Sequence, residues 1–133
     1  HPRTKKCLKE SGLSDNYSDK IRFLPPVGYF DMLVLESEAK LIVTDSGGVQ
    51  KEAYFFQVPC LVLREESEWV ELIEEGYASL VGSDTEVIKE GYEKMLKSNI
   101  KWRPGIYGNG QCAANILKNL WTKFSKTTEN ALI

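Results

Sequence analysis

Short apolar runs alternate with amphipathic segments along this chain. Strands are predicted where apolar residues are continuous and turn residues bound them, at Ile21–Leu24, Leu41–Val43, Cys60–Leu63 and Ala78–Val81. Helices are predicted where apolar residues recur with a helical period, at Thr4–Leu13, Gly28–Glu38, Gly47–Phe56, Trp69–Glu75, Asp84–Leu96 and Gln111–Phe124. Strands separated by helices favour parallel pairing, so the pattern predicts an α/β fold with a Rossmann-like parallel sheet and flanking helices.

Two of these helices also carry predictions about packing. In Gly28–Glu38, the pattern makes Phe30, Leu33 and Val34 available to the core. In the last helix, one apolar stripe is typical of core or domain packing, and it consists of Cys112, Ile116, Leu120, Trp121 and Phe124. We expect a single domain over residues 1–126 and a frayed tail over residues 127–133.

Composition narrows the class of protein. At 133 residues, with 42% hydrophobic and 27% charged residues, the chain resembles an ordinary globular domain. A net charge of −2 gives no electrostatic footprint for nucleic acid. The apolar runs are only as long as strands and no leader peptide is recognisable, so no membrane partner is expected. The sequence starts at His1 rather than at a methionine, which suggests a truncated or processed chain. Three widely spaced cysteines form no metal or disulfide pattern, which favours reduced thiols and a cytoplasmic location.

The segment Leu41–Glu52 carries the strongest indication of function. An apolar strand runs through a polar turn with Ser46, Gly47 and Gly48 directly into a helix. A helix start leaves backbone N–H groups unpaired and favours negative charge, Ser46 is a good N-cap, and the glycines let a ligand approach the backbone. Glu52 follows Gly48 by four residues, on the same helix face, where its carboxylate could accept hydrogen bonds from sugar hydroxyls. A phosphate site at the helix start with Glu52 one turn beyond it suits a nucleotide sugar. The turn by itself is equally consistent with a simple strand-to-helix connection.

The longer run favours the nucleotide-sugar interpretation. Thr44–Ala53, followed by Val58–Arg64, closely resembles the carboxy-terminal domain of UDP-N-acetylglucosamine 2-epimerases. In that family the first segment reads Thr-Asp-Ser-Gly-Gly-(Val/Ile)-Gln-Glu-Glu-Ala, and a Val-Pro strand follows it. Further segments that resemble the family are His1–Thr4, Tyr29–Ala39, Leu80–Asp84 and Tyr107–Ala113. The resemblance therefore covers nearly the whole chain.

The resemblance implies that the chain is part of a longer protein. Family enzymes are built like B-fold glycosyltransferases, with two Rossmann-like domains and an active site in the cleft between them. The amino-terminal domain, with family residues of the chemistry, has no counterpart here, and neither has the His-Arg-Arg/Lys-Glu-Asn motif. The implied partners are a UDP-sugar substrate, the missing amino-terminal domain and a second copy in a homodimer. No cofactor and no metal are implied.

The resemblance also assigns roles to individual residues. The diphosphate would bind to Ser46, Gly47 and Gly48, and the ribose hydroxyls to Glu52. Val27–Met32 would border the uracil; because Met32 replaces a frequent aromatic, stacking would be weaker or would fall to Tyr29 or Phe30. His1, the only histidine, would border the nucleotide sugar.

The loop Arg64–Glu71 departs most from the family. Enzymes that act on UDP-N-acetylglucosamine usually read Arg-Asp-Thr-Thr-Glu-Arg-Pro-Glu here, whereas this chain has Trp69 and Val70. A Ser/Thr-Glu-Trp-Val-Glu version resembles the subgroup that epimerises UDP-2,3-diacetamido-2,3-dideoxy-glucuronate. The alternative is that Trp69 simply packs at a helix start. Glu68 is the one local carboxylate that could approach the sugar, as an orienting residue or as a catalytic one.

The implied reaction is inversion at carbon 2 of a UDP-2-acetamido sugar, by elimination of UDP and its re-addition, for surface polysaccharide precursors. The full-length protein would thus be an isomerase, while the isolated chain is expected to fold without turnover, because the acid and base residues belong to the missing half. Two alternatives stay open. One is the donor domain of a B-fold glycosyltransferase, and the other is a non-catalytic nucleotide-binding module.

Overall fold

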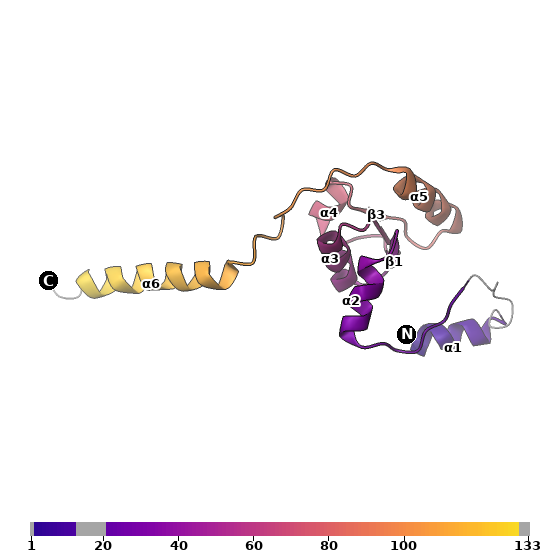
Figure 1. Ribbon diagram of the computed structural model, residues 1–133, viewed down its shortest axis with the longest axis horizontal. Coiled ribbons are helices and arrows are strands. Elements are labelled where there is room, and N and C mark those ends of the chain that lie inside the picture. The colour runs from indigo at the N-terminus through magenta and orange to yellow at the C-terminus, as the bar shows by residue number, and fades with distance from the viewer. Residues whose placement is uncertain (1, 13–20, 131–133) are drawn as a thin grey trace. The chain divides into compact units, whose positions relative to one another are not determined.

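The computed structural model describes residues 2–12 and 21–130, and these ranges contain six helices and three strands. The helices are α1 (Pro2–Glu10), α2 (Tyr29–Ser37), α3 (Gly47–Phe56), α4 (Val70–Glu74), α5 (Thr85–Lys97) and α6 (Cys112–Asn130). The strands are β1 (Ile42–Thr44), β2 (Cys60–Val62) and β3 (Ala78–Leu80). Contacts divide the chain into two units, His1–Ile100 and Lys101–Ile133. Figure 1 labels the elements of both.

The first unit is built on a parallel sheet with strand order β1-β2-β3. Ile42 pairs with Cys60, and Cys60 pairs with Ala78, so the three strands start in register. Each strand is joined to the next through a helix, α3 and then α4, as parallel pairing requires. The predicted α/β fold with a parallel sheet and flanking helices is therefore confirmed.

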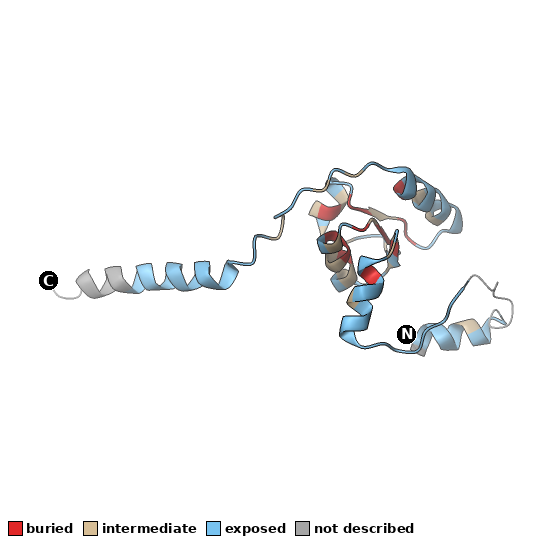
Figure 2. Ribbon diagram, in the orientation of Figure 1, coloured by how far each residue is buried: buried red, intermediate tan, exposed pale blue. Residues whose placement is uncertain are grey.

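Side chains of β2 form the centre of the core because this strand is covered on both faces. All three of its residues are buried, and buried residues gather around the sheet and α3 (Figure 2). Leu61 packs with Val81 and with Met95 of α5. Since successive strand residues point to opposite faces, Cys60 and Val62 lie on the other face. Continuous apolar strands of this kind are typical of parallel sheets that helices cover on both sides.

Helix α5 approaches the sheet closely because it has a glycine at the contact. A Cβ atom built on Gly91 would lie 2.6 Å from a methyl group of Val81 and 3.3 Å from one of Leu61. Asp84 begins this helix, and its carboxylate accepts hydrogen bonds from the N–H groups of Glu86 at 2.9 Å and Val87 at 3.1 Å. The cap fixes where α5 starts, and the glycine fixes how near it lies to the strands.

The predicted strand Ile21–Leu24 is wrong. These residues form no regular structure in the described chain, and Ile21, Phe23 and Leu24 are exposed. A strand needs a neighbour for its N–H and C=O groups, and none of the three described strands pairs with this segment. The apolar pattern alone therefore misassigned it.

The predicted inward face of α2 is also wrong in part. Phe30 and Val34 are exposed at 79% and 60%, Leu33 is half-buried, and the buried residue is Glu36. α2 contacts α3, and Leu33 and Glu36 are three residues apart, so they share the face that turns inward. A carboxylate is thus buried on α2, while two of the three apolar residues expected in the core are exposed.

The second unit contains the long helix α6, which extends through Asn130 and includes residues 127–130 of the segment expected to be a tail. The stripe of Cys112, Ile116, Leu120, Trp121 and Phe124 is exposed, so the described residues do not supply the packing that its pattern predicts. The single domain over residues 1–126 stays a prediction. None of the described helices combines the length and the apolar character needed to cross a membrane.

Candidate functional site

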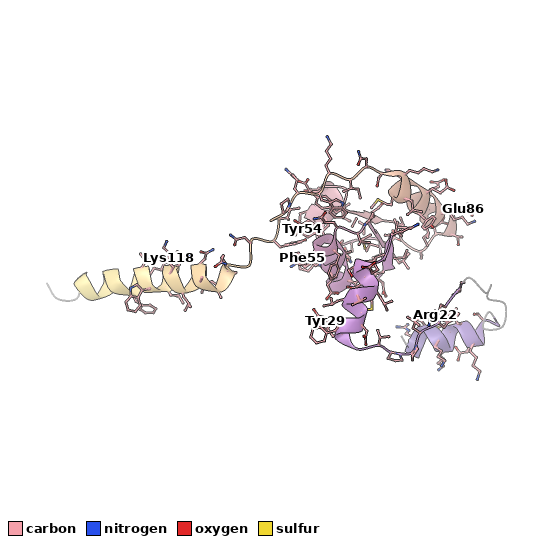
Figure 3. All side chains as sticks on the ribbon, in the orientation of Figure 1. Arg22, Tyr29, Tyr54, Phe55, Glu86 and Lys118 are labelled. Atoms are coloured by element: carbon pink, nitrogen blue, oxygen red, sulfur yellow. The ribbon has the colours of Figure 1, made fainter. Side chains whose placement is uncertain are left out.

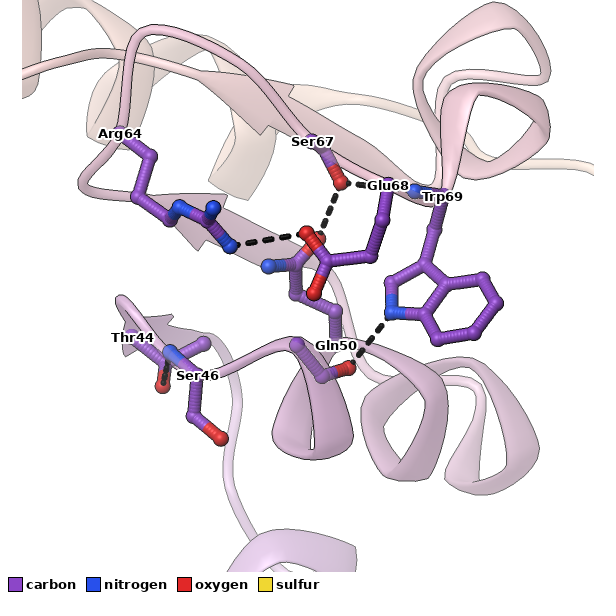
Figure 4. A network of polar contacts seen from close by, with 8 residues as sticks. Thr44, Ser46, Gln50, Arg64, Ser67, Glu68 and Trp69 are labelled. Atoms are coloured by element: carbon purple, nitrogen blue, oxygen red, sulfur yellow. Dashed lines mark hydrogen bonds and ion pairs between the residues drawn. The ribbon is translucent and has the colours of Figure 1, made fainter.

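The turn between β1 and α3 places a row of backbone donors after the carboxyl end of a strand. Ser46 is the N-cap residue of α3, with φ −88° and ψ 125°, but its hydroxyl makes no capping hydrogen bond. Instead, the Ser46 N–H donates to the Thr44 hydroxyl oxygen at 3.0 Å, which fixes the turn (Figure 4). The Ser46 hydroxyl stays exposed and has no described partner. Ser46 is thus the N-cap residue, as predicted, but its hydroxyl does not cap the helix and can form a hydrogen bond with another group.

The first N–H groups of α3 have no protein acceptor in the described chain. The first hydrogen bond of the helix runs from the Gln50 N–H to the Ser46 carbonyl, so Gly47, Gly48 and Val49 precede the ladder. A Cβ atom built on Gly48 would meet only the Ser46 Oγ atom, at 3.8 Å, so the space in front of it is open. Unpaired N–H groups and the positive end of the helix dipole favour an anion at this point.

The loop after β2 is tied to this helix start by a chain of polar contacts (Figure 4). The Ser67 hydroxyl donates to Gln50 Oε1 at 2.7 Å and accepts from the Trp69 N–H at 3.0 Å. Trp69 Nε1–H donates to the Gly47 carbonyl at 2.8 Å, and the Lys51 ammonium lies 3.9 Å from the centre of the Trp69 ring. Loop and helix therefore form one structural unit, although Ser67 lies seventeen residues after Gln50 in the sequence.

Glu68 lies directly against the start of α3. A Cβ atom on Gly47 would overlap the Glu68 carboxylate, so only glycine fits at this position without a shift. The Glu68 carboxylate also accepts a hydrogen bond from Arg64 Nη1 at 2.8 Å, in an ion pair whose side chains are 46% and 36% exposed. This pair aligns a carboxylate at the helix start without burying it, which fits an orienting role.

Glu52 lies one turn further along α3, half-buried, and faces a second carboxylate from α2. Glu36 is only 3% exposed, and neither of its carboxylate oxygens has a hydrogen-bond partner among the described residues. Burial, and then the negative charge of Glu52, raise the pKa of Glu36 above its ordinary value. Burial, with a smaller effect of Glu36, raises the pKa of the Cys60 thiol to about 12.

The predicted site residues are brought together only in part. Ser46, Gly47, Gly48, Glu68 and Trp69 meet at the start of α3. Tyr29 and Met32 lie on the first turns of α2 and are exposed at 65% and 39%; Figure 3 labels Tyr29 there. No described contact joins either of them to the helix start, although the Tyr29 and Phe30 rings meet edge to face at 5.7 Å. His1 lies outside the described residues.

Two residues of this region were missed by the analysis of the sequence. Gln50 is 1% exposed and holds Ser67, while its Nε2 group is buried without a described partner. Glu36 was missed because it lies beside the face of Phe30, Leu33 and Val34 that was expected to be buried. Groups of acidic, cysteine or histidine side chains that could hold a metal ion are absent from the described ranges.

Comparisons with known proteins identify the family of the chain. The sequence profile of UDP-N-acetylglucosamine 2-epimerases matches residues 1–121. A UDP-N-acetylglucosamine 2-epimerase of Methanocaldococcus jannaschii is 44% identical over 122 residues, which are 90% of this chain and 33% of that protein. The UDP-2,3-diacetamido-2,3-dideoxy-D-glucuronate 2-epimerase of Pseudomonas aeruginosa is 39% identical over 120 residues, again 90% of this chain and 33% of that protein.

Solved structures give the same result. The crystal structure of the Methanocaldococcus jannaschii enzyme in complex with UDP-GlcNAc and UDP is similar with a TM-score of 0.79, at 44% identity, over 92% of this chain and 34% of that one. The chain thus spans about a third of the length of the curated relatives it matches. By both the profile and the fold, the chain belongs to the UDP-N-acetylglucosamine 2-epimerase family.

Proposed function

We propose that this chain is the UDP-binding part of an enzyme that epimerises a UDP-2-acetamido sugar at carbon 2. The observation that carries the proposal is the start of α3, where three consecutive N–H groups and the Ser46 hydroxyl have no described protein partner. The diphosphate would accept hydrogen bonds from Ser46, Gly47 and Gly48. A relative at 44% identity has been solved with UDP-GlcNAc and UDP, which supports a ligand of this class.

The remaining nucleotide contacts would come from Glu52 and from residues outside α3. Glu52 lies one turn beyond the helix start and would accept hydrogen bonds from the ribose hydroxyls. Tyr29 and Met32 on α2 would border the uracil, and the exposed face of Tyr29 is suited to stacking on a base. His1 would complete the nucleotide-sugar contacts from the start of the chain.

The chemistry proposed for the whole protein has two steps. A base removes the proton at carbon 2 while the bond from carbon 1 to the UDP oxygen breaks, and the electron pair of that bond leaves with UDP. Re-addition of UDP to carbon 1 and of a proton to the other face of carbon 2 gives the epimer. The start of α3 would stabilise the charge on departing UDP, because fixed donors act where charge develops. The acid and base residues would come from the part of the enzyme outside this chain.

Glu68 and Trp69 would border the sugar. The ion pair with Arg64 and the position over Gly47 support Glu68 as an orienting residue rather than the base. Trp69 is tied to Gly47 through its indole N–H, which supports a position for it beside a sugar that follows the diphosphate. We therefore propose a UDP-2,3-diacetamido-uronate as substrate, with UDP-N-acetylglucosamine as the competing candidate. We also propose that the full-length enzyme is a homodimer and that it is located in the cytoplasm.

Titration of UDP into the isotope-labelled chain, followed by amide chemical shifts, tests the site. We expect shifts at residues 46–52, and we expect Glu52→Ala to weaken binding by about 1–3 kcal/mol because ribose hydroxyls lose their acceptor. Glu90→Ala, an exposed residue of α5, is the matched control. Shifts confined to another part of the chain would refute the site.

The activity is tested separately from the site. We expect no epimerisation of UDP-N-acetylglucosamine or its diacetamido-uronate relative by the isolated chain, because half of the cleft would be absent. Turnover that appears only when the other domain is added would support an incomplete epimerase. Transfer of the sugar to an acceptor would instead favour a glycosyltransferase, and no turnover in the full-length protein would leave a nucleotide-binding module.

A further inference from the structure

Glu36 is the one carboxylate of the described chain that is buried, and the structure gives it an unusual environment. Its side chain is 3% exposed and both of its oxygens lack a hydrogen-bond donor among the described residues. An ionised carboxylate without donors or a cation is costly to bury, whereas a protonated one needs only an acceptor for its O–H group. The burial therefore favours the neutral acid.

The neighbours of Glu36 define what its proton can do. Helix α2 contacts α3, and the negative charge of the Glu52 carboxylate on α3 lies near enough to Glu36 to raise its pKa. A second titratable group near Glu36 is the Cys60 thiol of β2, which stays protonated because burial raises its pKa to about 12. Glu52 is therefore the acceptor that the structure offers to a Glu36 O–H group.

Glu52 is half-buried, so a ligand can still reach part of it. We propose that Glu36 is a positioning residue, which donates a hydrogen bond from its protonated carboxyl group to Glu52 and thereby holds the Glu52 carboxylate in place for the ribose hydroxyls of the nucleotide. This inference rests on the proposed function of Glu52. It adds a residue that does not itself touch the ligand.

The proposal makes nucleotide affinity depend on pH in one direction. Glu36 loses its proton as pH rises above its raised pKa, and it then repels Glu52 instead of holding it. Affinity is therefore highest at the acidic end and falls as pH rises. Glu36→Gln keeps the shape and an N–H donor but cannot ionise, so this dependence disappears. Glu36→Leu removes the donor at every pH.

The experiment is a calorimetric titration of UDP at several pH values, from about pH 5 to about pH 8, with Glu36→Gln, Glu36→Leu and the exposed control Glu38→Gln. Comparison of each variant with the parent at the same pH cancels the ionisation of UDP itself. The ratio of the parent Kd to that of Glu36→Gln should rise by about three- to tenfold over this range, the value of one hydrogen bond. Glu38→Gln should follow the parent, and Glu36→Leu should bind more weakly than Glu36→Gln throughout.

A constant ratio, or equal affinities of Glu36→Gln and Glu36→Leu, would overturn the positioning role. Thermal melts of each variant keep folding separate from binding. Glu52→Ala distinguishes the two levels of failure. If Glu52→Ala weakens UDP binding while the ratio stays constant, only the role of Glu36 fails. If Glu52→Ala leaves the Kd unchanged, the proposed nucleotide site itself fails.

Discussion

Gly48→Ala should stabilise the fold and weaken nucleotide binding, because a methyl group there suits the helix but fills the space that a ligand would occupy. Gly48 lies in the first turn of α3, and a Cβ atom there meets only Ser46 Oγ at 3.8 Å. Alanine is the better helix former, and it also restricts the unfolded chain. The free energy of unfolding should therefore rise by about 0.4–1 kcal/mol.

Binding should change in the opposite direction. The added methyl group would occupy the open space in which a diphosphate would approach the N–H groups of Gly47, Gly48 and Val49. Loss of one hydrogen bond to a charged ligand costs about 1.5–3 kcal/mol. That range corresponds to an increase in the Kd of UDP of about 10- to 100-fold.

Urea denaturation and calorimetric UDP titration of the same variant measure both quantities. Gly47→Ala is the matched comparison, because its methyl group overlaps the Glu68 carboxylate and lies 3.3 Å from Trp69 Nε1. Its gain in helix propensity should be offset by displacement of the loop, so its stability should be no higher than that of Gly48→Ala. An unchanged Kd in Gly48→Ala would refute the diphosphate position, and a clear loss of stability would refute the open space.

Three further outcomes follow from the site and the core. In the full-length enzyme, Trp69→Arg should shift relative kcat/KM from the diacetamido-uronate toward UDP-N-acetylglucosamine, as kinetics with both substrates would show. If Trp69 only packs, the ratio of the two kcat/KM values should stay unchanged and thermal melts should show lower stability. At pH values above the raised pKa of Glu36, the free energy of unfolding of Glu36→Gln should exceed that of the parent by up to about 1–3 kcal/mol. Urea denaturation should show this difference shrinking as pH falls toward 4.5, where the carboxyl group of the unfolded parent also gains its proton. Cys60, with a pKa of about 12, should resist a thiol reagent in the folded chain, whereas the exposed Cys7 and Cys112 react; rapid labelling of all three would contradict the burial.

The sheet could be predicted from the sequence because its signals are local. Each of the three confirmed strands is an apolar run bounded by turn residues, and the sequence places β2 within one residue of its observed end at Val62. Ile21–Leu24 carries the same signal and fails, since pairing is a property of two segments. An apolar run predicts burial, but only a neighbouring strand makes it a strand.

The candidate site likewise has a part that the sequence predicts and a part that it does not. The turn at Ser46, Gly47 and Gly48 is a local motif and was predicted with its helix. The contact of Ser67 with Gln50, and of Glu68 with Gly47, joins segments about twenty residues apart, and no periodicity within either segment encodes it. Glu36 could not be assigned because the face of α2 that turns inward is decided by its contact with α3, not by the hydrophobic pattern of α2 alone.

The close approach of α5 to the sheet makes two distant positions depend on each other during divergence. Gly91 weakens its helix by about 1 kcal/mol relative to alanine, yet a methyl group there would collide with Val81. A larger residue at 91 becomes acceptable only after the side chain at 81 has become smaller, and the smaller side chain alone would leave a void. Each single substitution therefore destabilises the fold, and a change at both positions passes through a less stable protein. A lineage that keeps Gly91 thus has a physical reason to keep Val81, and the reverse also holds.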